Sequence, residues 1–286
     1  MQMQQRWVGA KVQKKTPAHQ GDRMSLVTQY KPGTFCWVDL ATSDAKGAEQ
    51  FYTALFDWTT EARPMGPDEF YVMCKRNGHY AAAFYQPAPE HSGGLPPHWK
   101  TYIAVADADA TAKRAVELGG QVALEPMDVF TSGRMAVIID PTGAMFCLWQ
   151  PREHVGAGVI NEPGSPLWYE LMTRDTKAAD EFYSGLFGWK SEARDMGHMI
   201  YNTFSNGDRP TGGMFQIPEG MEKMPPHWAV HFAASDIDAS TAHACQLGGE
   251  VLMPPTDIPD VGRVAVLSDP QGAAFGILKL LREITS

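Results

Sequence analysis

An apolar stretch at residues 35–40 is the first strong pattern in the chain, and its boundaries, Gly33 and the polar run 42–44, predict a β-strand. Asp44 is a residue type that caps helices, and apolar positions recur after it at helical spacing, which predicts a helix. Two short extended segments follow, around residues 70–74 and 80–86. The apolar face of the predicted helix consists of Ala48, Phe51, Tyr52, Leu55 and Phe56.

The same order restarts after a loop rich in proline and glycine at residues 87–97. Residues 99–105 predict a strand, and Asp107 or Asp109 caps a helix that runs to Leu118. Two glycines end that helix, and two or three strands follow, the last of them after a D-P-x-G turn at residues 140–143. Residues 35–150 therefore contain the order β-α-β-β-β twice.

The whole arrangement then occurs a second time. Residues 37–58 read WVDLATSDAKGAEQFYTALFDW and residues 168–189 read WYELMTRDTKAADEFYSGLFGW, with 11 of 22 positions identical. The motifs EARxMG, PPHW, DxDA, LGG, GRxAV and DPxGxxF also recur, at an offset that drifts only from 131 to 129 residues. A duplication explains this, and the chain is predicted to contain four modules.

Composition is consistent with two globular domains, because 44% of the 286 residues are hydrophobic. We expect domains at 32–150 and 164–286, a linker at 151–163, and a disordered basic extension at 1–31. The net charge is −9, of which residues 1–31 carry +5 and the remainder −14. An acidic body repels phosphate backbones, so nucleic acid is not an expected partner.

Nothing in the chain predicts a membrane or secreted protein. No run of about 18 apolar residues occurs, and the basic N-terminal stretch is not followed by the apolar region of a signal peptide. The four cysteines are far apart and form no CxxC pair, which argues against a zinc knuckle or a disulfide scaffold. We therefore expect a cytoplasmic location.

The motifs resemble those of the vicinal oxygen chelate superfamily, which includes glyoxalase I, extradiol dioxygenases and bleomycin-resistance proteins. The resemblance rests on D-x6-F-Y-x-x-L-F-x-W after the first strand, D-x-D-A, LGG and D-P-x-G-x-x-F, and it covers about residues 33–150 and 164–280. It is closest to two-domain glyoxalase-like proteins called "hydroxylase" or antigen, some of them from aromatic polyketide pathways. It implies an α+β fold with tandem glyoxalase-like domains, in which four βαβββ modules form two cupped mixed sheets.

The resemblance also implies a divalent metal, held by side chains on the first and fourth strands of the modules. In this chain the second copy has lost every expected ligand and the first keeps only Cys147, because tryptophan, glycine and alanine offer no ligand atom and lysine is a cation. The positions near 83–85 and 213–215 hold no His, Glu or Gln either. We therefore expect no cofactor, and a divalent metal is disfavoured. The remaining positions are Trp37, Lys100 and Cys147 in the first copy and Trp168, Ala229 and Gly276 in the second.

A shifted site is the alternative. Strand alternation places Asp39 on the same face as Trp37, and Glu170 on the same face as Trp168. Glu170 and His231 each lie two residues beyond an expected ligand position, so they are the candidate catalytic residues, as an acid/base pair or as two metal ligands. A buried, hydrogen-bonded carboxylate is the structural alternative.

Aromatic side chains dominate the predicted inner faces, which favours stacking on a small, planar, oxygenated ligand. Met199 or Met214 is expected nearby. The same rings could instead fill cups that have lost their metal. The predicted ligand-binding residues are Trp37, Asp39, Tyr85, Lys100, Tyr102, Cys147, Trp149, Trp168 and Phe215.

Three functions remain open from the sequence. In the first, the protein binds an aromatic metabolite without acting on it, in a sequestering, carrier or accessory role. Alternatively, it is a glyoxalase-like lyase, hydroxylase or oxygenase, either metal-free or with a divergent metal site. In the third case the cups are vestigial and the chain is an interaction protein. His98 and His227, both in Pro-Pro-His-Trp, are expected to be structural. The two copies are expected to pair within one chain as a monomer, or to form a homodimer.

Overall fold

The computed structural model describes residues 26–67, 69–88, 94–197 and 199–282. Within these ranges the chain forms sixteen strands and four helices. The first copy contains β1 (Phe35–Ala41), α1 (Ala45–Phe56), β2 (Thr59–Gly66), β3 (Glu69–Arg76), β4 (His79–Tyr85), β5 (His98–Ala104), α2 (Ala108–Glu117), β6 (Gln121–Val129), β7 (Gly133–Ile139) and β8 (Met145–Pro151). The second contains β9 (Pro166–Thr173), α3 (Thr176–Phe187), β10 (Lys190–Asp195), β11 (Ile200–Asn206), β12 (Arg209–Gln216), β13 (His227–Ala233), α4 (Ile237–Gln246), β14 (Glu250–Ile258), β15 (Gly262–Ser268) and β16 (Ala274–Leu280).

Each copy forms one curled eight-stranded mixed sheet. The strand orders are β2-β3-β4-β1-β5-β8-β7-β6 and β10-β11-β12-β9-β13-β16-β15-β14. In the first sheet β1 runs parallel to β4 and antiparallel to β5, and β5 runs parallel to β8. Two βαβββ modules thus meet at the central pair β1 and β5, and the second sheet repeats this at β9 and β13. The predicted four-module architecture is confirmed.

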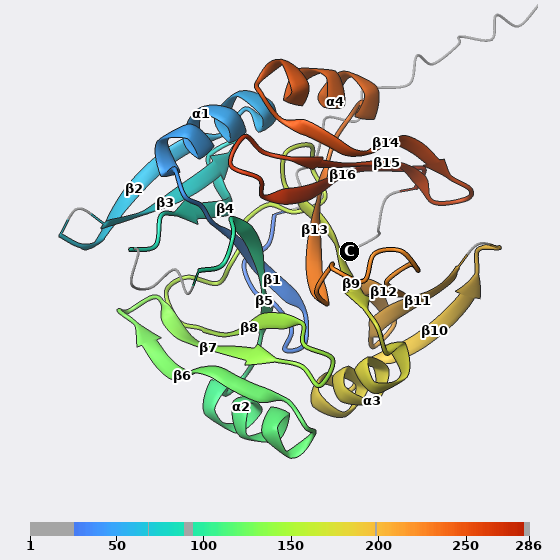
Figure 1. Ribbon diagram of the computed structural model, residues 1–286. Helices are drawn as coiled ribbons and strands as arrows, with labels where there is room; N and C mark the ends of the chain where they lie inside the picture. Colours follow the sequence, from blue (N-terminus) through green and yellow to red (C-terminus); the bar gives the residue numbers. More distant parts are fainter. Residues whose placement is uncertain (1–25, 68, 89–93, 198, 283–286) are drawn as a thin grey trace, which may run out of the picture.

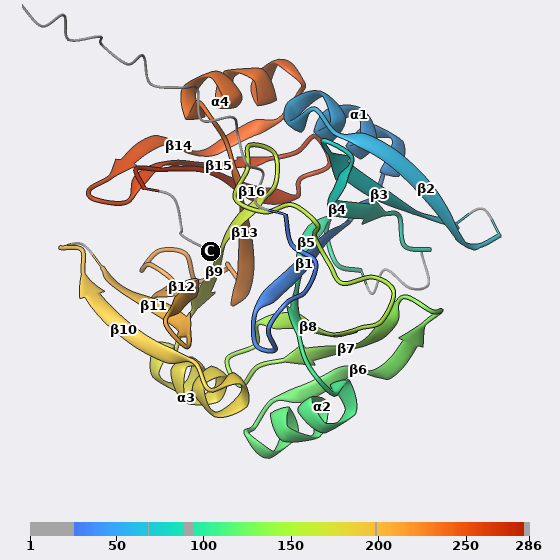
Figure 2. The same ribbon diagram turned by 180° about the vertical axis from the view of Figure 1, so that it is seen from behind.

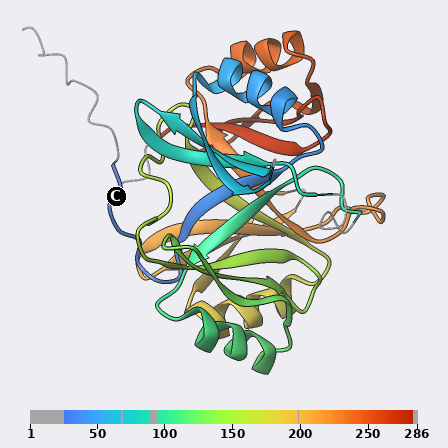
Figure 3. The ribbon, with the colours of Figure 1, turned by 90° about the vertical axis from the view of Figure 1, so that its left-hand side faces the viewer.

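Helices cover the outer faces of the sheets, and the two copies pack against each other through these helices and through their central strands. Helix α1 lies beside α4 at one end of the molecule, and α2 lies beside α3 at the other (Figures 1 and 3). A single hydrophobic core spans both copies, in which Phe35 stacks on Tyr169 with ring centroids 4.1 Å apart. Because burial of apolar area is the main stabilising term in folding, the copies depend on each other for stability.

The repeated D-P-x-G motif has a role in this packing. Asp140 accepts hydrogen bonds from backbone amides of its own turn and one from the Tyr183 hydroxyl of the other copy, at 2.9 Å. Asp269 is bonded in the same way by Tyr52, at 3.0 Å. The aromatic residues of α1 and α3 were predicted to be core, and the structure places them at the junction between the copies.

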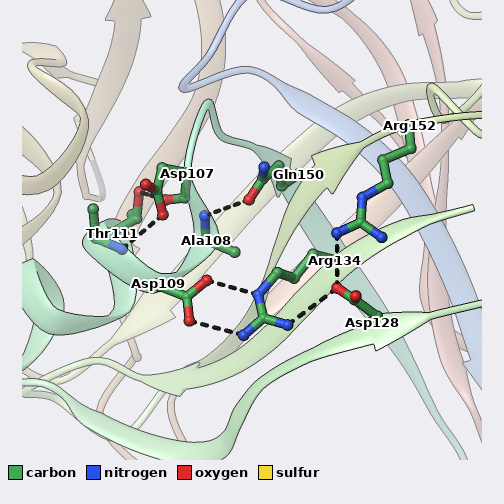
Figure 4. A network of polar contacts seen from close by, with 9 residues as sticks. Asp107, Ala108, Asp109, Thr111, Asp128, Arg134, Gln150 and Arg152 are labelled. Atoms are coloured by element: carbon green, nitrogen blue, oxygen red, sulfur yellow. Dashed lines mark hydrogen bonds and ion pairs between the residues drawn. The ribbon is translucent and has the colours of Figure 1, made fainter.

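The D-x-D-A and G-R-x-A-V motifs are joined by ion pairs between their side chains (Figure 4). Asp107 caps α2, while Arg134 makes a bidentate pair with Asp109, at 2.6 and 2.8 Å, and a further bond to Asp128 at 3.0 Å. Arg263 makes the same contacts with Asp238 and Asp257. These are exposed pairs that hold a helix N-terminus to its hairpin, so the motifs are structural.

One domain-boundary expectation needs correction here. Residues 26–31 were expected to belong to a disordered extension, but Leu26 pairs with Val159 and the Tyr30 hydroxyl donates to the Ala157 carbonyl at 2.8 Å. Tyr30 is buried, because the chain after β8 packs over it. Residues 1–25 lie outside the described residues. None of the helices in the described part of the chain has the length and apolarity needed to cross a membrane.

Candidate functional site

A carboxylate lies on the concave face of each sheet, held in both copies by the same chain of hydrogen bonds. In the first copy the Trp37 indole donates to the Tyr71 hydroxyl at 2.8 Å, and that hydroxyl donates to Asp39 at 3.0 Å. In the second, Trp168 donates to Tyr201 at 2.8 Å. Tyr201 in turn donates to Glu170 at 2.7 Å. The predicted sharing of a face by each tryptophan and its carboxylate is confirmed.

The two tyrosines are the main functional side chains that sequence reasoning missed. Tyr71 lies on β3 and Tyr201 on β11, each two strands away from the carboxylate that it binds. A signal was present, because the two tyrosines lie 130 positions apart, at the offset of the repeat. Burial beside a carboxylate raises the pKa of both hydroxyls, so they act as hydrogen-bond donors at neutral pH.

The first cup surrounds Asp39 completely. The Tyr102 hydroxyl donates to Asp39 at 2.7 Å, and the Lys100 ammonium lies 3.2 Å from its other oxygen. Lys100 also donates to the Tyr85 hydroxyl at 2.8 Å. Burial lowers the pKa of Lys100, but Asp39, Cys147 and Tyr85 outweigh that effect and raise it above its ordinary value. Lys100 is therefore a cation, as expected from the sequence.

Cys147 and Trp149 complete this cup from β8. Cys147 is fully buried beside Tyr102, and burial raises the pKa of its thiol to about 12. The thiol therefore stays protonated at neutral pH and is not a nucleophile there. The Trp149 indole donates to the His154 carbonyl at 2.8 Å. The predicted first-cup residues do lie together, but their polar groups bond one another and are buried.

The chain between the two copies closes the first cup. We call residues 152–160 the strap; Figure 2 shows this yellow-green stretch between β8 and β9 crossing the first sheet. The Ala157 amide donates to the Cys36 carbonyl at 2.7 Å, and the Gly158 amide donates to the Tyr80 carbonyl at 2.7 Å. Underneath, Trp37 is only 3% exposed and Asp39 only 1%. Residues 151–163 therefore do more than link the copies, which the sequence did not indicate.

His154 is the strap residue that enters the cup. Its ring lies edge-on to Trp37 with centroids 4.6 Å apart, and it also contacts Tyr80 and Trp149. Its Nε2 atom is buried and has no hydrogen-bond partner among the described residues. Burial, and secondarily Arg63, lowers the pKa of His154 to about 4. The first cup thus contains an aromatic ring of its own.

We expect the strap to loosen in acid. The pKa of His154 is about 4 in the folded protein and about 6.5 when exposed, so between these values the unfolded or strap-open state binds the proton. Stability is therefore full above about pH 6.5 and is lost as pH falls toward 4, by roughly 2 to 3 kcal/mol. Urea unfolding of wild type and His154→Leu at pH 7.5 and 4.5 measures this. An identical pH dependence in the two proteins would contradict the assignment.

The second cup holds its carboxylate with different partners. His231 Nε2 lies 3.0 Å from Glu170, on the opposite carboxylate oxygen from Tyr201. Burial raises the pKa of Glu170, but His231 and the hydrogen bonds outweigh that effect and lower it. Glu170 is therefore ionised at neutral pH. The predicted Glu170–His231 pair is present, and Phe215 stacks beside Tyr201 as a further wall, with centroids 6.3 Å apart.

Two glycines create the space for this arrangement. A Cβ atom on Gly276 would lie 1.9 Å from His231 Nδ1, and one on Gly213 would lie 1.9 Å from the Tyr201 hydroxyl. The first copy has Cys147 and Ala83 at these positions, which are paired in register with Tyr102 and Asp39. The loss of a side chain at Gly276 is therefore what admits the imidazole.

The second cup is the more open of the two. Trp168 is only partly buried, and the Glu170 side chain is 19% exposed. The described part of the second copy ends at Arg282, and no segment corresponding to the strap crosses this cup within it. The prediction that Met214 lies beside the cup is wrong, because this residue faces the helices in the shared core. Met199 lies in the hairpin before β11, where its carbonyl accepts from Met196.

The residues of the cups do not fit a divalent metal. Lys100 is protonated and Cys147 offers a single buried sulfur, while Ala229 and Gly276 have no donor atoms. Glu170 and His231 supply two donors, and among the described residues no three of His, Cys, Asp and Glu gather in one place. Two protein donors fall short of the three that catalytic zinc sites use.

The two histidines of the Pro-Pro-His-Trp motifs are structural, as predicted. His98 Nδ1 lies 2.8 Å from the Pro96 carbonyl, and His227 Nδ1 lies 2.8 Å from the Pro225 carbonyl. Each imidazole therefore closes the loop at the start of a central strand.

Comparison with known proteins agrees with the two-copy fold, because each copy matches a family model of its own. Residues 34–148 match the model of the Glyoxalase/Bleomycin resistance protein/Dioxygenase superfamily, and residues 168–278 match that of the Glyoxalase-like domain. "Putative glyoxylase CFP32" of Mycobacterium tuberculosis is 43% identical over 254 residues, which cover 88% of this chain and 97% of the relative. The chain belongs to this superfamily. "Anthracycline biosynthesis protein DnrV" of Streptomyces peucetius, a further relative, is 36% identical over 267 residues, covering 89% of this chain and 96% of that protein.

Solved structures show the same fold at low sequence identity. The Mn(II)-bound glyoxalase from Novosphingobium aromaticivorans has a TM-score of 0.62 at 14% identity, over 89% of this chain and 84% of that one. The 2,3-dioxygenase LapB from Pseudomonas sp. KL28 has a TM-score of 0.60 at 14% identity, over 86% and 91%. These similarities show that the chain has the fold of these proteins. One fold supports many reactions, so the function has to be argued from the residues of the cups.

Proposed function

We propose that the protein binds a small, planar, hydroxylated aromatic molecule in the second cup without using a metal, in a sequestering, carrier or accessory role. The observation that carries this proposal is the partly exposed Glu170 carboxylate. It stands among the rings of Trp168, Tyr201 and Phe215. An ionised carboxylate with free lone pairs accepts a ligand hydroxyl, and the flat rings bury the ligand's apolar surface.

The first cup supports the proposal by contrast. There a ring supplied by the chain, His154, already lies against Trp37, the counterpart of Trp168. Asp39 has three partners and almost no exposure. We therefore expect one ligand per chain, bound in the second copy. The name of the 36% identical relative points in the same direction, because anthracyclines are planar, oxygenated aromatic compounds.

Acid/base catalysis by Glu170 and His231 is the second candidate, favoured by their 3.0 Å contact. Two features make binding the better proposal. A lowered pKa makes Glu170 a weak base at neutral pH. His231 uses Nε2 on Glu170, and its Nδ1 is buried against Gly276. Recovery of unchanged ligand after long incubation supports binding alone, and formation of a product would establish catalysis.

We expect Glu170→Gln to weaken binding of 1,2-dihydroxyanthraquinone by roughly 10- to 100-fold, because a hydrogen bond to a charged group contributes about 1.5 to 3 kcal/mol. Calorimetric titration measures affinity and stoichiometry, and quenching of tryptophan fluorescence gives a second readout. Trp168→Phe should reduce the quenching while retaining binding.

The matched control is Asp39→Asn, which makes the equivalent change in the closed cup and should leave the affinity unchanged. The proposal is wrong if wild type fails to bind any hydroxylated aromatic, or if Asp39→Asn abolishes binding while Glu170→Gln does not.

A further inference from the structure

A cleft lies between the two copies, next to the second cup. Its volume is about 190 Å³. Its walls come from residues 27–35, from the end of the strap with the start of β9, and from the hairpin between β11 and β12. Trp168 belongs both to this cleft and to the hydrogen-bond chain of the second cup. The cleft therefore adjoins the proposed binding site at Trp168.

The position of the cleft corresponds to that of the strap in the first copy. The strap lies along Cys36 and Tyr80 by donating to their carbonyl oxygens. The residues at the repeat-related positions, Leu167 and Pro210, both line the cleft. What the first copy fills with its own chain is thus an open space in the described part of the second copy.

The rim of the cleft is positively charged. Lys31 and Arg209 both line it and are exposed, and no Asp or Glu is among the lining residues. In the described part of the chain neither cation makes an ion pair with a carboxylate. Lys31 Nζ is 3.3 Å from where a Cβ on Gly207 would lie, which places it over the β11–β12 turn, whose charged residues are Asp208 and Arg209. Two unpaired cations at one cleft are unusual in a chain whose residues 32–286 carry a net charge of −14.

We propose that this cleft is the anion-binding end of the second cup, and that the ligands are planar aromatic acids. The carboxylate lies between Lys31 and Arg209, and the aromatic ring contacts Trp168. This assignment rests on the proposed function and narrows its ligand class. It adds two residues, remote from Glu170 in sequence, that discriminate acids from neutral aromatics of the same shape.

The test compares 5,6-dihydroxyanthraquinone-2-carboxylate with its 2-carboxamide, which have the same ring system and the same hydroxyl groups and differ in charge. Wild type should bind the acid roughly tenfold more tightly than the amide at low salt, and this preference should shrink as ionic strength rises. Lys31→Gln/Arg209→Gln should bind both compounds equally, with the amide affinity unchanged. Both residues are exposed, so the variant is expected to fold, which circular dichroism verifies.

The matched control is Lys177→Gln/Lys190→Gln, which removes the same two charges from exposed positions on α3 and β10 and should keep the preference for the acid. Equal binding of acid and amide by wild type, or an unchanged preference in the Lys31/Arg209 variant, overturns this inference and leaves the second cup as the binding site. Failure of both compounds and of 1,2-dihydroxyanthraquinone to bind overturns the proposed function and this inference together.

Discussion

Lys100→Met should lower the free energy of unfolding by about 3 kcal/mol, because removing one partner of a buried ion pair leaves a charge without compensation. The Lys100 and Asp39 side chains are only 14% and 2% exposed. Methionine keeps most of the volume, so the change isolates the charge. Tyr71 and Tyr102 still donate to Asp39 in the variant, which holds the loss at the lower end of the range for buried pairs. Urea unfolding followed by circular dichroism measures the loss.

Two comparisons make this result specific. Lys177→Met removes a lysine whose side chain is 86% exposed and paired with Glu181, so it should cost less than about 0.5 kcal/mol. Lys100→Met/Asp39→Asn removes both charges and should be more stable than Lys100→Met alone. If the double variant is the less stable protein, the first cup is not held by a compensated charge pair.

Gly276→Ala should disable the second cup. A methyl group there would lie 1.9 Å from His231 Nδ1, so the imidazole has to move away from Glu170. Overpacking costs about 1 to 3 kcal/mol, and loss of the hydrogen bond to the carboxylate adds about 1.5 kcal/mol or more. We expect a loss of about 3 kcal/mol in the free energy of unfolding, and loss of binding of 1,2-dihydroxyanthraquinone beyond 30-fold.

Gly276→Ala/His231→Ala provides the control, since it removes the ring that the methyl group strikes. Stability should be partly restored in this double variant, while binding stays weak because Glu170 has lost a partner. A Gly276→Ala protein with wild-type stability and affinity would show that the imidazole does not occupy the position described.

Much of the architecture follows from local pattern. The repeat predicted four modules, and strand alternation placed Asp39 and Glu170 beside their tryptophans correctly. The lack of metal-ligand residue types at every expected position except Cys147 could also be read directly, because it depends on residue identity alone. These features are local, or are repeated at a fixed offset, so no tertiary information was needed.

The rest depended on contacts that periodicity does not encode. Tyr71 binds Asp39 across an intervening strand, which requires the register of three strands. The strap has no regular pattern, so nothing in its sequence indicated that His154 lies inside the first cup. The cleft with Lys31 and Arg209 exists because an N-terminal segment that was expected to be disordered packs between the copies.

The two cups show how one scaffold can be closed in one copy and open in the other. Both retain the tryptophan, the tyrosine and the carboxylate, so the duplicated framework is the same. The differences are concentrated at four places: Lys100 in the first copy against Ala229 in the second, Tyr102 against His231, Cys147 against Gly276, and the strap. The first-copy residues close the cup around Asp39 and neutralise its charge. The second-copy residues leave the Glu170 carboxylate accessible to a ligand.

The central claim, that the second cup is the binding site and the first is closed, is tested most directly by a crystal structure of the protein with 1,2-dihydroxyanthraquinone. The account predicts one ligand per chain, with its ring against Trp168 and a hydroxyl within hydrogen-bond distance of Glu170, while His154 remains against Trp37. A ligand in the first cup with the strap displaced, or a metal ion coordinated by Glu170 and His231, would contradict it.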